Sequence, residues 1–385
     1  MSTPLRLVIL GQDSHMFARP GGAPNDTRAR HLEYVREFLR RRPGSEVRII
    51  VHTRRGDGFV HDRPFAGLEI FGTDSPSRLR APLDMLRLLR SMLKKGWQPD
   101  LITCQTGYEE GLVAFLSGAR RARIQVQVHA DVYGAAFAAR GRINRLRAWG
   151  TRRAIRRADH VRVVSSGIER AIVAAGDMPA DRIAVAPVPV AFAAQERRPD
   201  AGNPVLLFVG RLVPEKDLGL WCRTARLVRE AMPEVRLVIA GDGPERAVVA
   251  RELAGQVDAL TMKGAVAYDD LPALFAAASL FLFTSEHEGL GRVVVEAMMA
   301  GLPIVSTDID GPRDLIQDGA TGRLVPRDAA SLADACLALL RDPARADAMA
   351  AAARAWADAH YSFAAVTRRL VDSWEAAAAL PRRRP

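Results

Sequence analysis

Two carboxylates and a group of glycines lie close together in residues 285–308, and their chemistry suits sugar hydroxyls and phosphate. Glu288 stands among glycines, and Glu296 follows eight positions later in an otherwise apolar run. Glycine lets backbone N–H groups approach a ligand closely, and the start of a following helix adds partial positive charge. We therefore expect ligand contacts from Glu288, Gly289, Leu290 and Gly291.

Glu296 is surrounded in sequence by valine, alanine and methionine, and it needs hydrogen-bond donors because a buried carboxylate without a partner is strongly unfavourable. The 2′- and 3′-hydroxyls of a ribose would satisfy both of its oxygens. The alternative is a structural carboxylate that pairs with an arginine elsewhere in the chain. The sequence leaves both interpretations open.

Two cations, Arg211 and Lys216, follow the apolar run 205–209 and Gly210. Arginine offers two parallel donors and lysine a mobile point charge, which together suit a diphosphate. A solvated loop that carries two cations is the alternative. Gly264 and Val266 follow another expected strand, where free backbone groups are placed to hydrogen-bond a nucleobase.

Other candidates lie in the first half of the chain. His129 ends an apolar run at the expected carboxyl edge of a sheet, where a structural and a functional role are equally plausible. Gly21 and Gly22 lie in a loop, 11–26, that is long for its position, and long loops are often functional. These glycines are placed to approach a phosphate or an acceptor.

Several motifs are missing from the sequence. The first loop contains no G-x-G-x-x-G, which argues against a dinucleotide oxidoreductase, and there is no Walker A sequence. There is also no H-E-x-x-H and no cluster of aspartates of the kind that holds a metal. We expect a mechanism without a metal or a cofactor.

Short apolar runs alternate with helical patterns along the whole chain, which predicts βαβ units. Strands are predicted near 5–10, 47–52, 101–104, 124–129, 160–164, 205–209, 235–240, 259–262, 280–284, 303–306 and 322–325. Helices are predicted near 27–42, 82–95, 108–118, 140–157, 167–175, 217–231, 244–254, 270–277, 291–300 and 312–317. The fold class is α/β, with two Rossmann-like, doubly wound parallel-sheet domains that face a central cleft.

The predicted domains are an acceptor-side domain over 1–190 and a nucleotide-binding domain over 204–360. A linker rich in proline and charge joins them at 191–203, and a helix at 361–385 is expected to cross back to the first domain. The length of 385 residues fits about two domains.

Charge is distributed unevenly: residues 1–200 hold 34 Lys+Arg against 20 Asp+Glu, and residues 201–385 hold 21 against 24. A basic half suits a polyanion, an acidic substrate or an anionic membrane, although a general preference for arginine explains it equally well. Residues 140–159 form a basic helical pattern with apolar residues interspersed. This helix either lies on anionic lipid or packs on the sheet with its arginines in water.

The three cysteines are scattered, which indicates reduced thiols and a cytoplasmic location. No apolar run approaches the length of a membrane span. We expect a protein that is cytoplasmic and peripheral on the inner membrane face.

Taken in order, the motifs resemble those of retaining, family-4-type glycosyltransferases with the GT-B fold. The resemblance rests on G-R-x4-K from Gly210, G-x-G-P from Gly241, and E-x7-E with E-A-M-x-x-G-x-P from Glu288. It is strong over 205–326 and looser over 1–190. The segments 157–167 and 311–326 fit the same pattern.

The resemblance implies a role for each matching residue. Glu296 would bind the nucleotide ribose, and Arg211 and Lys216 would hold the diphosphate. Glu288 and the amides of 289–291 would contact the donor sugar, with His129 facing it across the cleft. It also implies retention of the anomeric configuration without a divalent metal.

The expected function is transfer of a sugar from a nucleoside-diphosphate sugar, UDP-linked, to a glycan or lipid-linked acceptor in surface polysaccharide or glycolipid synthesis. Nucleic acid is not an expected partner. One alternative is a nucleotide-sugar epimerase of the same architecture, which alters a sugar without an acceptor. Another is a basic polyanion-binding protein, whose binding would fall steeply with salt and survive loss of Glu296.

Overall fold

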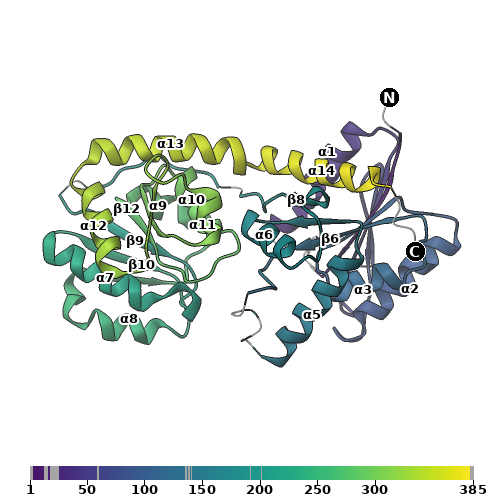
Figure 1. Ribbon diagram of the computed structural model, residues 1–385, viewed down its shortest axis with the longest axis horizontal. Helices are drawn as coiled ribbons and strands as arrows, with labels where there is room; N and C mark the ends of the chain where they lie inside the picture. The colour runs from purple at the N-terminus through teal and green to yellow at the C-terminus, as the bar shows by residue number, and fades with distance from the viewer. Residues whose placement is uncertain are drawn as a thin grey trace. The chain divides into compact units, whose positions relative to one another are not determined.

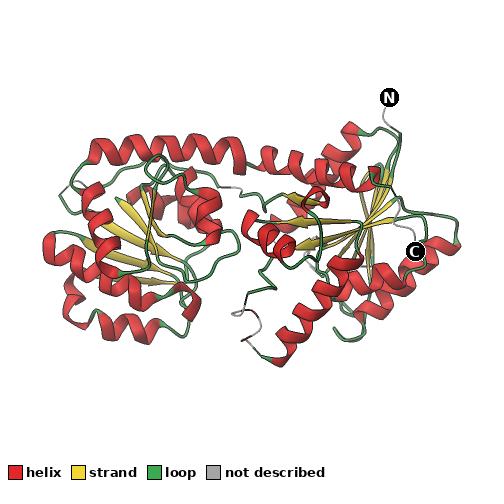
Figure 2. Cartoon of the chain, viewed as in Figure 1, coloured by secondary structure: helices red, strands yellow, loops and turns green. Residues whose placement is uncertain are grey.

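The computed structural model describes the chain except for residues 1–2, 13–15, 18–25, 59, 135–136, 138, 140, 191, 201 and 382–385. It divides into two compact units, each a parallel sheet covered by helices (Figures 1 and 2). Unit 1 comprises Met1–Pro187 with Val366–Pro385, and unit 2 comprises Val188–Ala365. None of the described helices combines the length and the apolar character needed to cross a bilayer.

Unit 1 is built on an eight-stranded sheet in the order β3-β4-β2-β1-β5-β6-β7-β8. Its strands are β1 (Arg6–Gly11), β2 (Glu46–Val51), β3 (His61–Phe65), β4 (Leu68–Gly72), β5 (Leu101–Cys104), β6 (Arg123–Val128), β7 (His160–Val163) and β8 (Ile183–Val185). All neighbours are parallel except β3 and β4. The strand order reverses direction between β1 and β5, which is where open α/β sheets bind ligands.

The helices of unit 1 are α1 (Asp26–Arg41), α2 (Ala81–Lys94), α3 (Glu109–Leu116), α5 (Arg142–Arg157) and α6 (Ser166–Ala174), together with most of α14 (Phe363–Ala379). Trp374 explains why the last helix belongs here. It is almost fully buried, and it meets Tyr34 and Phe38 of α1 edge to face. An ion pair of 2.6 Å between Arg42 and Glu375 supports the same contact.

Unit 2 is built on a six-stranded, wholly parallel sheet in the order β11-β10-β9-β12-β13-β14. Its strands are β9 (Val205–Val209), β10 (Arg236–Ala240), β11 (Leu260–Gly264), β12 (Leu280–Phe283), β13 (Ile304–Thr307) and β14 (Arg323–Val325). Its helices are α7 (Leu218–Ala231), α8 (Arg246–Glu252), α9 (Leu271–Ala277), α10 (Arg292–Met299), α11 (Asp310–Leu315), α12 (Ala329–Leu340) and α13 (Pro343–Tyr361).

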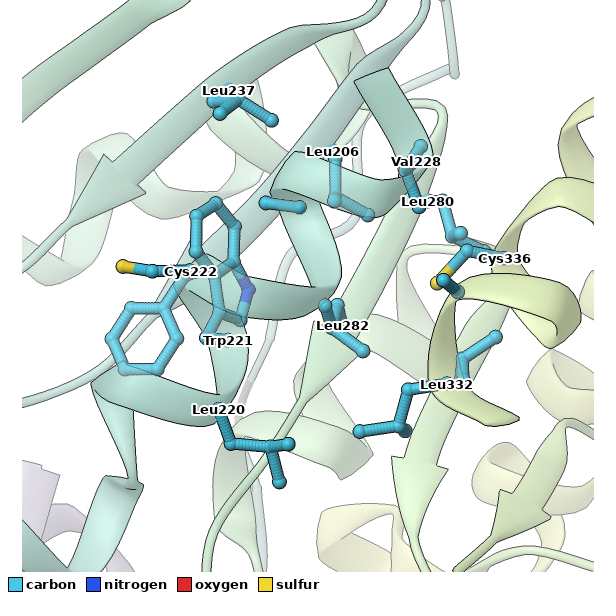
Figure 3. Packing of buried hydrophobic residues seen from close by; sticks show 14 of the residues in the cluster. Leu206, Leu220, Trp221, Cys222, Val228, Leu237, Leu280, Leu282, Leu332 and Cys336 are labelled. Carbon is cyan, nitrogen blue, oxygen red and sulfur yellow. The ribbon is translucent and has the colours of Figure 1, made fainter. Parts of the chain in front are cut away.

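The alternation of side chains along β9 divides the interior of unit 2 into two cores. Leu206 and Phe208 pack with α7, α8 and α12 on one face, as Figure 3 shows around Trp221. Leu207 and Val209 pack with α9, α10 and α13 on the other. Because both faces are covered, the strands are continuous apolar runs.

Glycine is required where the loop after β10 crosses the loop after β9. Gly241 and Gly243 have φ of 149° and 151°, and a Cβ atom on either would clash with the carbonyl of Gly210 or Leu212. Backbone bonds of 2.9 Å from Gly210 to Ala240 and from Leu212 to Asp242 tie the loops together. The G-x-G-P sequence therefore shapes the loop that carries Arg211.

The predicted fold class is confirmed, and every predicted strand and helix lies within two residues of an observed one. Three strands, β3, β4 and β8, were not predicted, and the expectation of an entirely parallel first sheet was wrong at its β3 edge. The units divide between Pro187 and Val188, so the predicted linker 191–203 is grouped with unit 2.

Candidate active site

Most of the predicted site residues of unit 2 lie on loops at the carboxyl edge of its sheet. The loop after β9 carries Arg211 and Lys216, and the loop after β12 carries Glu288. β9 lies between β10 and β12, so these two loops flank the point where the strand order reverses. Ligands of open α/β sheets bind at that point.

Local structure fixes the backbone of the Lys216 loop. Residues Pro214–Lys216 form a short 3-10 turn, after which Asp217 adopts φ of 47° and caps α7 by accepting a bond of 3.0 Å from the amide of Leu220. The hydroxyl of Thr284, at the end of β12, donates to the carbonyl of Lys216 at 2.9 Å. The two loops are thus joined through backbone and side chain.

Lys216 and Glu288 form an ion pair through Nζ and Oε2. Their side chains are 15% and 24% exposed, so water reaches the pair only partly. The ammonium also lies 5.2 Å from the centre of the Phe283 ring. A cation held in a partly desolvated position is suited to an anionic ligand, and in this structure Glu288 is its counter-ion.

Close contacts gather the glycines around this pair. A Cβ atom on Gly210 would lie 3.8 Å from Lys216 Cε, and one on Gly291 would lie 3.5 Å from Glu288 Cγ. Gly291 has φ of 85° and precedes α10, whose first amides point toward the loop. Gly264 accepts a bond of 2.7 Å from the amide of Gly241, which places it beside the same loops.

Glu296 has polar partners within the protein in this structure. It is buried on α10, and its Oε1 accepts a bond of 3.0 Å from Nε of Arg292, one helical turn earlier. The hydroxyl of Tyr268 also bonds to it. The alternative of a carboxylate paired with an arginine describes this geometry.

Burial raises the pKa of Glu296, and the charge and hydrogen bond of Arg292 oppose that rise. The guanidinium of Arg292 is 39% exposed and lies 5.0 Å from the centre of the Tyr268 ring. The ribose role of Glu296 stays a prediction.

The remaining predicted residues of unit 2 differ in burial. Arg211 is exposed, and within the described part of the chain its side chain has no hydrogen-bond or ion-pair partner. Leu290 is buried and Val266 is half-buried, and both pack in the core on the α10 side of the sheet. Lys216 and Arg292 are thus paired with Glu288 and Glu296, whereas Arg211 presents an exposed charge to an anionic ligand such as a diphosphate.

His129 belongs to unit 1 and is described separately from these residues. It is exposed at the carboxyl end of β6. Surrounding protein atoms and the charges of Arg162 and Arg30 shift the pKa of His129 downward. Gly21 and Gly22 lie outside the described residues.

A small pocket of about 10 Å³ at the carboxyl edge of unit 1, with several polar side chains around it, was not predicted. Gln12 follows β1 and donates to Glu109 at 2.6 Å, and Arg78 donates to Gln12 at 3.1 Å. His52 and the buried Glu110 complete the polar lining. These residues come from four separate segments, and the only sequence signal for a common edge was their position near the ends of predicted strands and the starts of predicted helices.

Comparisons with known proteins agree with this architecture. Residues 203–342 match the family model described as "Glycosyl transferases group 1", and residues 29–189 match "Glycosyl transferase 4-like domain". Among solved structures, HepE of Anabaena in complex with UDP and glucose superposes with a TM-score of 0.68. That likeness covers 96% of this chain and 99% of the other at 19% identity, and it shows the fold alone.

Two relatives extend the comparison. An alpha-D-kanosaminyltransferase of Streptomyces kanamyceticus is 29% identical over 58% of this chain and 61% of its own length. A GDP-mannose-dependent alpha-(1-6)-phosphatidylinositol monomannoside mannosyltransferase of Mycobacterium tuberculosis is 34% identical over 48% of this chain. The match spans 51% of that mannosyltransferase. With both of its units matched by glycosyltransferase family models, the chain belongs to the family-4-type glycosyltransferases of the GT-B fold.

Proposed function

We propose that this glycosyltransferase takes a sugar from a nucleoside-diphosphate donor, UDP-linked, and transfers it with retention of the anomeric configuration. The observation that carries the proposal is the cluster at the carboxyl edge of unit 2. There Lys216, Glu288 and the glycines at 210 and 291 meet the start of α10. The relatives support the reaction class, and one of them is named for a GDP-linked donor.

Charge at this edge supports a diphosphate leaving group. Lys216 and Arg211 would neutralise its negative charge, and the first amides of α10 would add their partial charge. Fixed cations at the place where charge develops are among the largest contributions to catalysis. In this proposal the two cations and the amides of α10 perform the charge neutralisation that a divalent metal ion performs in other transferases.

The proposed chemistry conserves the anomeric configuration through attack on the same face. The acceptor hydroxyl oxygen forms the bond to the anomeric carbon as the bond from that carbon to the β-phosphate oxygen breaks. The hydroxyl proton passes to the departing phosphate oxygen. Glu288 would hold a donor hydroxyl once the diphosphate has taken its place on Lys216, and Glu296 would bind the ribose.

The acceptor in this proposal is a glycan or a lipid-linked glycan. The polar side chains at the carboxyl edge of unit 1 support it, because Gln12, Glu109 and Arg78 offer donors and acceptors suited to sugar hydroxyls. We propose that the protein works at the cytoplasmic face of a membrane. Its three cysteines are free and buried, in keeping with reduced thiols.

A thermal-shift panel tests the donor. It compares UDP, GDP and the corresponding sugar nucleotides, with Lys216→Ala beside Lys95→Ala, an exposed lysine of unit 1. At least one diphosphate should raise the Tm of the wild type and of Lys95→Ala, and Lys216→Ala should lose that rise. A panel without any shift contradicts the proposal. Incubation with the selected donor and no acceptor distinguishes a transferase from an epimerase, because an epimerase would produce an altered sugar nucleotide.

A further inference from the structure

Helix α5 carries large apolar side chains on its solvent side. Ile143, Leu146 and Trp149 are 69%, 66% and 59% exposed. At 100° per residue they fall in a sector of about 120°. The buried side of the same helix is formed by Ala148, Thr151, Ala154 and Ile155. The exposed stripe is therefore distinct from the face that packs on unit 1, so core packing does not account for it.

The neighbouring helices extend this surface. α3 contacts both α2 and α5, and all three run along one side of unit 1 (Figure 1). α3 exposes Leu112 and Leu116, α2 exposes Leu83, and Leu79 is exposed just before α2. Of the eleven large apolar side chains found exposed among the described residues, six belong to these three helices and a seventh, Leu79, lies just before α2. Such clustering marks an interaction surface.

A groove of about 450 Å³ adjoins the stripe, between α5 and residues 132–134. Arg145, Arg152 and Arg156 line it together with Tyr133, and Trp149 belongs both to the groove and to the stripe. The guanidinium of Arg152 stacks over the Tyr133 ring at 4.7 Å. The groove is thus a basic and aromatic site bordered by apolar side chains.

A buried carboxylate fixes the geometry of the groove. Asp177 accepts bonds from the Tyr133 hydroxyl at 2.6 Å, from Arg152 at 3.1 Å and from Arg156 at 2.8 Å. Burial raises the pKa of Asp177, but these three donors outweigh it and the net shift is downward. Asp177 is therefore ionised at neutral pH, and it balances one of the three arginine charges.

Arg145 adds an exposed charge that has no ion-pair partner within the described segments. The groove therefore has a surplus of positive charge, and Arg142 and Arg153 are exposed on the same helix. A guanidinium binds a phosphate by two parallel hydrogen bonds. Tryptophan and aliphatic side chains enter the boundary between lipid headgroups and acyl chains.

We propose that α5 is the membrane-docking element of this protein and that its arginine groove binds the phosphodiester headgroups of an anionic bilayer. Ile143, Leu146 and Trp149 enter the headgroup boundary beside the groove. This inference deepens the membrane part of the proposed function by naming the surface and its ligand. It involves neither the donor site of unit 2 nor any transfer step.

Vesicle flotation tests the proposal with two variants of exposed residues. The variant Ile143→Ser/Leu146→Ser/Trp149→Ser removes the apolar stripe, and Arg145→Gln/Arg153→Gln removes charge without touching Asp177. Wild-type protein should float with vesicles of phosphatidylcholine and phosphatidylglycerol, and much less with phosphatidylcholine alone. Binding should fall about five-fold for each arginine removed and roughly ten-fold or more for the apolar variant.

Matched controls come from unit 2. Val257→Ser removes a side chain that is 69% exposed, equal to Ile143, and Arg341→Gln removes an exposed arginine. Both should bind vesicles as the wild type does. Every variant should keep its Tm and its response to nucleoside diphosphate, so failure of docking is distinguishable from failure of the proposed function.

Three results would overturn the proposal. The first is that the apolar variant and the arginine variant both bind vesicles as well as the wild type does. The second is no preference for phosphatidylglycerol over phosphatidylcholine, since the groove then has no role. The third is displacement from vesicles by millimolar inorganic phosphate or by single-stranded RNA at constant ionic strength, which would identify a soluble anion or a nucleic acid as the ligand.

Discussion

The ammonium group of Lys216 and the carboxylate of Glu288 form an ion pair between two loops that are 72 residues apart in sequence. The pair lies where β9 and β12 end, at the reversal of strand order in unit 2. In the proposed reaction a diphosphate replaces Glu288 as the partner of Lys216. The two side chains should then respond to substitution in opposite ways.

Substitution of Glu288 by glutamine should strengthen nucleoside-diphosphate binding while it impairs transfer. The amide keeps the shape of the side chain but removes the competing charge from Lys216, so affinity should rise about five-fold. Lys216→Ala should weaken binding and lower kcat by about 100-fold or more. Calorimetric titration measures the affinities. Equal loss of affinity in both variants would mean that the pair is structural.

Substitution of Glu296 by glutamine should reduce the preference for ribose over deoxyribose in the nucleotide. A hydrogen bond from the 2′-hydroxyl to a carboxylate should make the wild type bind a nucleoside diphosphate roughly ten-fold tighter than its 2′-deoxy form. The variant should show a smaller difference. If the wild type does not distinguish the two nucleotides, Glu296 is a partner of Arg292 and nothing more.

Removal of Arg292 should destabilise the unliganded protein and leave the nucleotide-bound form less affected. Arg292→Ala leaves Glu296 buried without its ion-pair partner, at a cost of about 1–3 kcal/mol. If ribose hydroxyls bond to the carboxylate, saturating nucleotide should restore part of that loss. Chemical denaturation with and without nucleotide measures both quantities, and an unchanged deficit would argue against the ribose contact.

Alanine at Gly241 should destabilise unit 2 and disturb the Arg211 loop. The position has φ of 149°, and a Cβ atom there would clash with the Gly210 carbonyl. We expect a loss of about 2–4 kcal/mol, from backbone strain and overpacking. Gly255→Ala is the control because nothing lies within 4 Å of its Cβ position. Equal stability of the two variants would contradict this account of the G-x-G-P loop.

Stability should depend on pH through Glu110 of unit 1. Burial raises the pKa of Glu110 from 4.5 to about 7, so the native state holds a proton that the unfolded state releases between these values. The contribution of Glu110 to folding stability is fully present below pH 4.5 and is lost as pH rises through about 7. Glu110→Gln mimics the protonated acid and avoids this loss.

The free energy of unfolding of Glu110→Gln should therefore exceed that of the wild type by an amount that increases from pH 5 to pH 8, to at most about 3 kcal/mol. Urea denaturation at the two pH values measures it. Glu230→Gln, on the exposed side of α7, is the control. A gain that is the same at both pH values would place the pKa of Glu110 near that of an ordinary glutamate.

Most of the fold was predictable because buried parallel strands are continuous apolar runs, such as Val205–Val209 and Leu280–Phe283. Of the three missed strands, β4 (Leu68–Gly72) alternates buried and half-buried residues and is not a continuous apolar run, and the other two carry less signal still. β3 (His61–Phe65) is a short edge strand that contains Pro64 and no buried residue, and β8 (Ile183–Val185) has three half-buried residues. At the edge of a sheet, pairing is not reflected in hydrophobicity.

The site was predictable in its residues but not in their partners. The spacing of four between Arg292 and Glu296 on a helix is a signal for their ion pair, and it was available in the sequence. Tyr268 reaches Glu296 from another element, and Lys216 reaches Glu288 across two loops. Those contacts depend on tertiary packing, which motif spacing does not encode.

The most direct test of the central claim is a thermodynamic cycle between the β-phosphate and Lys216. Calorimetry would compare a nucleoside diphosphate, UDP or GDP as the thermal-shift panel selects, with its monophosphate. The two ligands are titrated into wild-type protein, Lys216→Ala and Lys95→Ala. We predict that the diphosphate binds at least about ten-fold tighter than the monophosphate to wild type and Lys95→Ala, and that Lys216→Ala abolishes most of this difference. An equal difference in all three proteins would contradict this prediction.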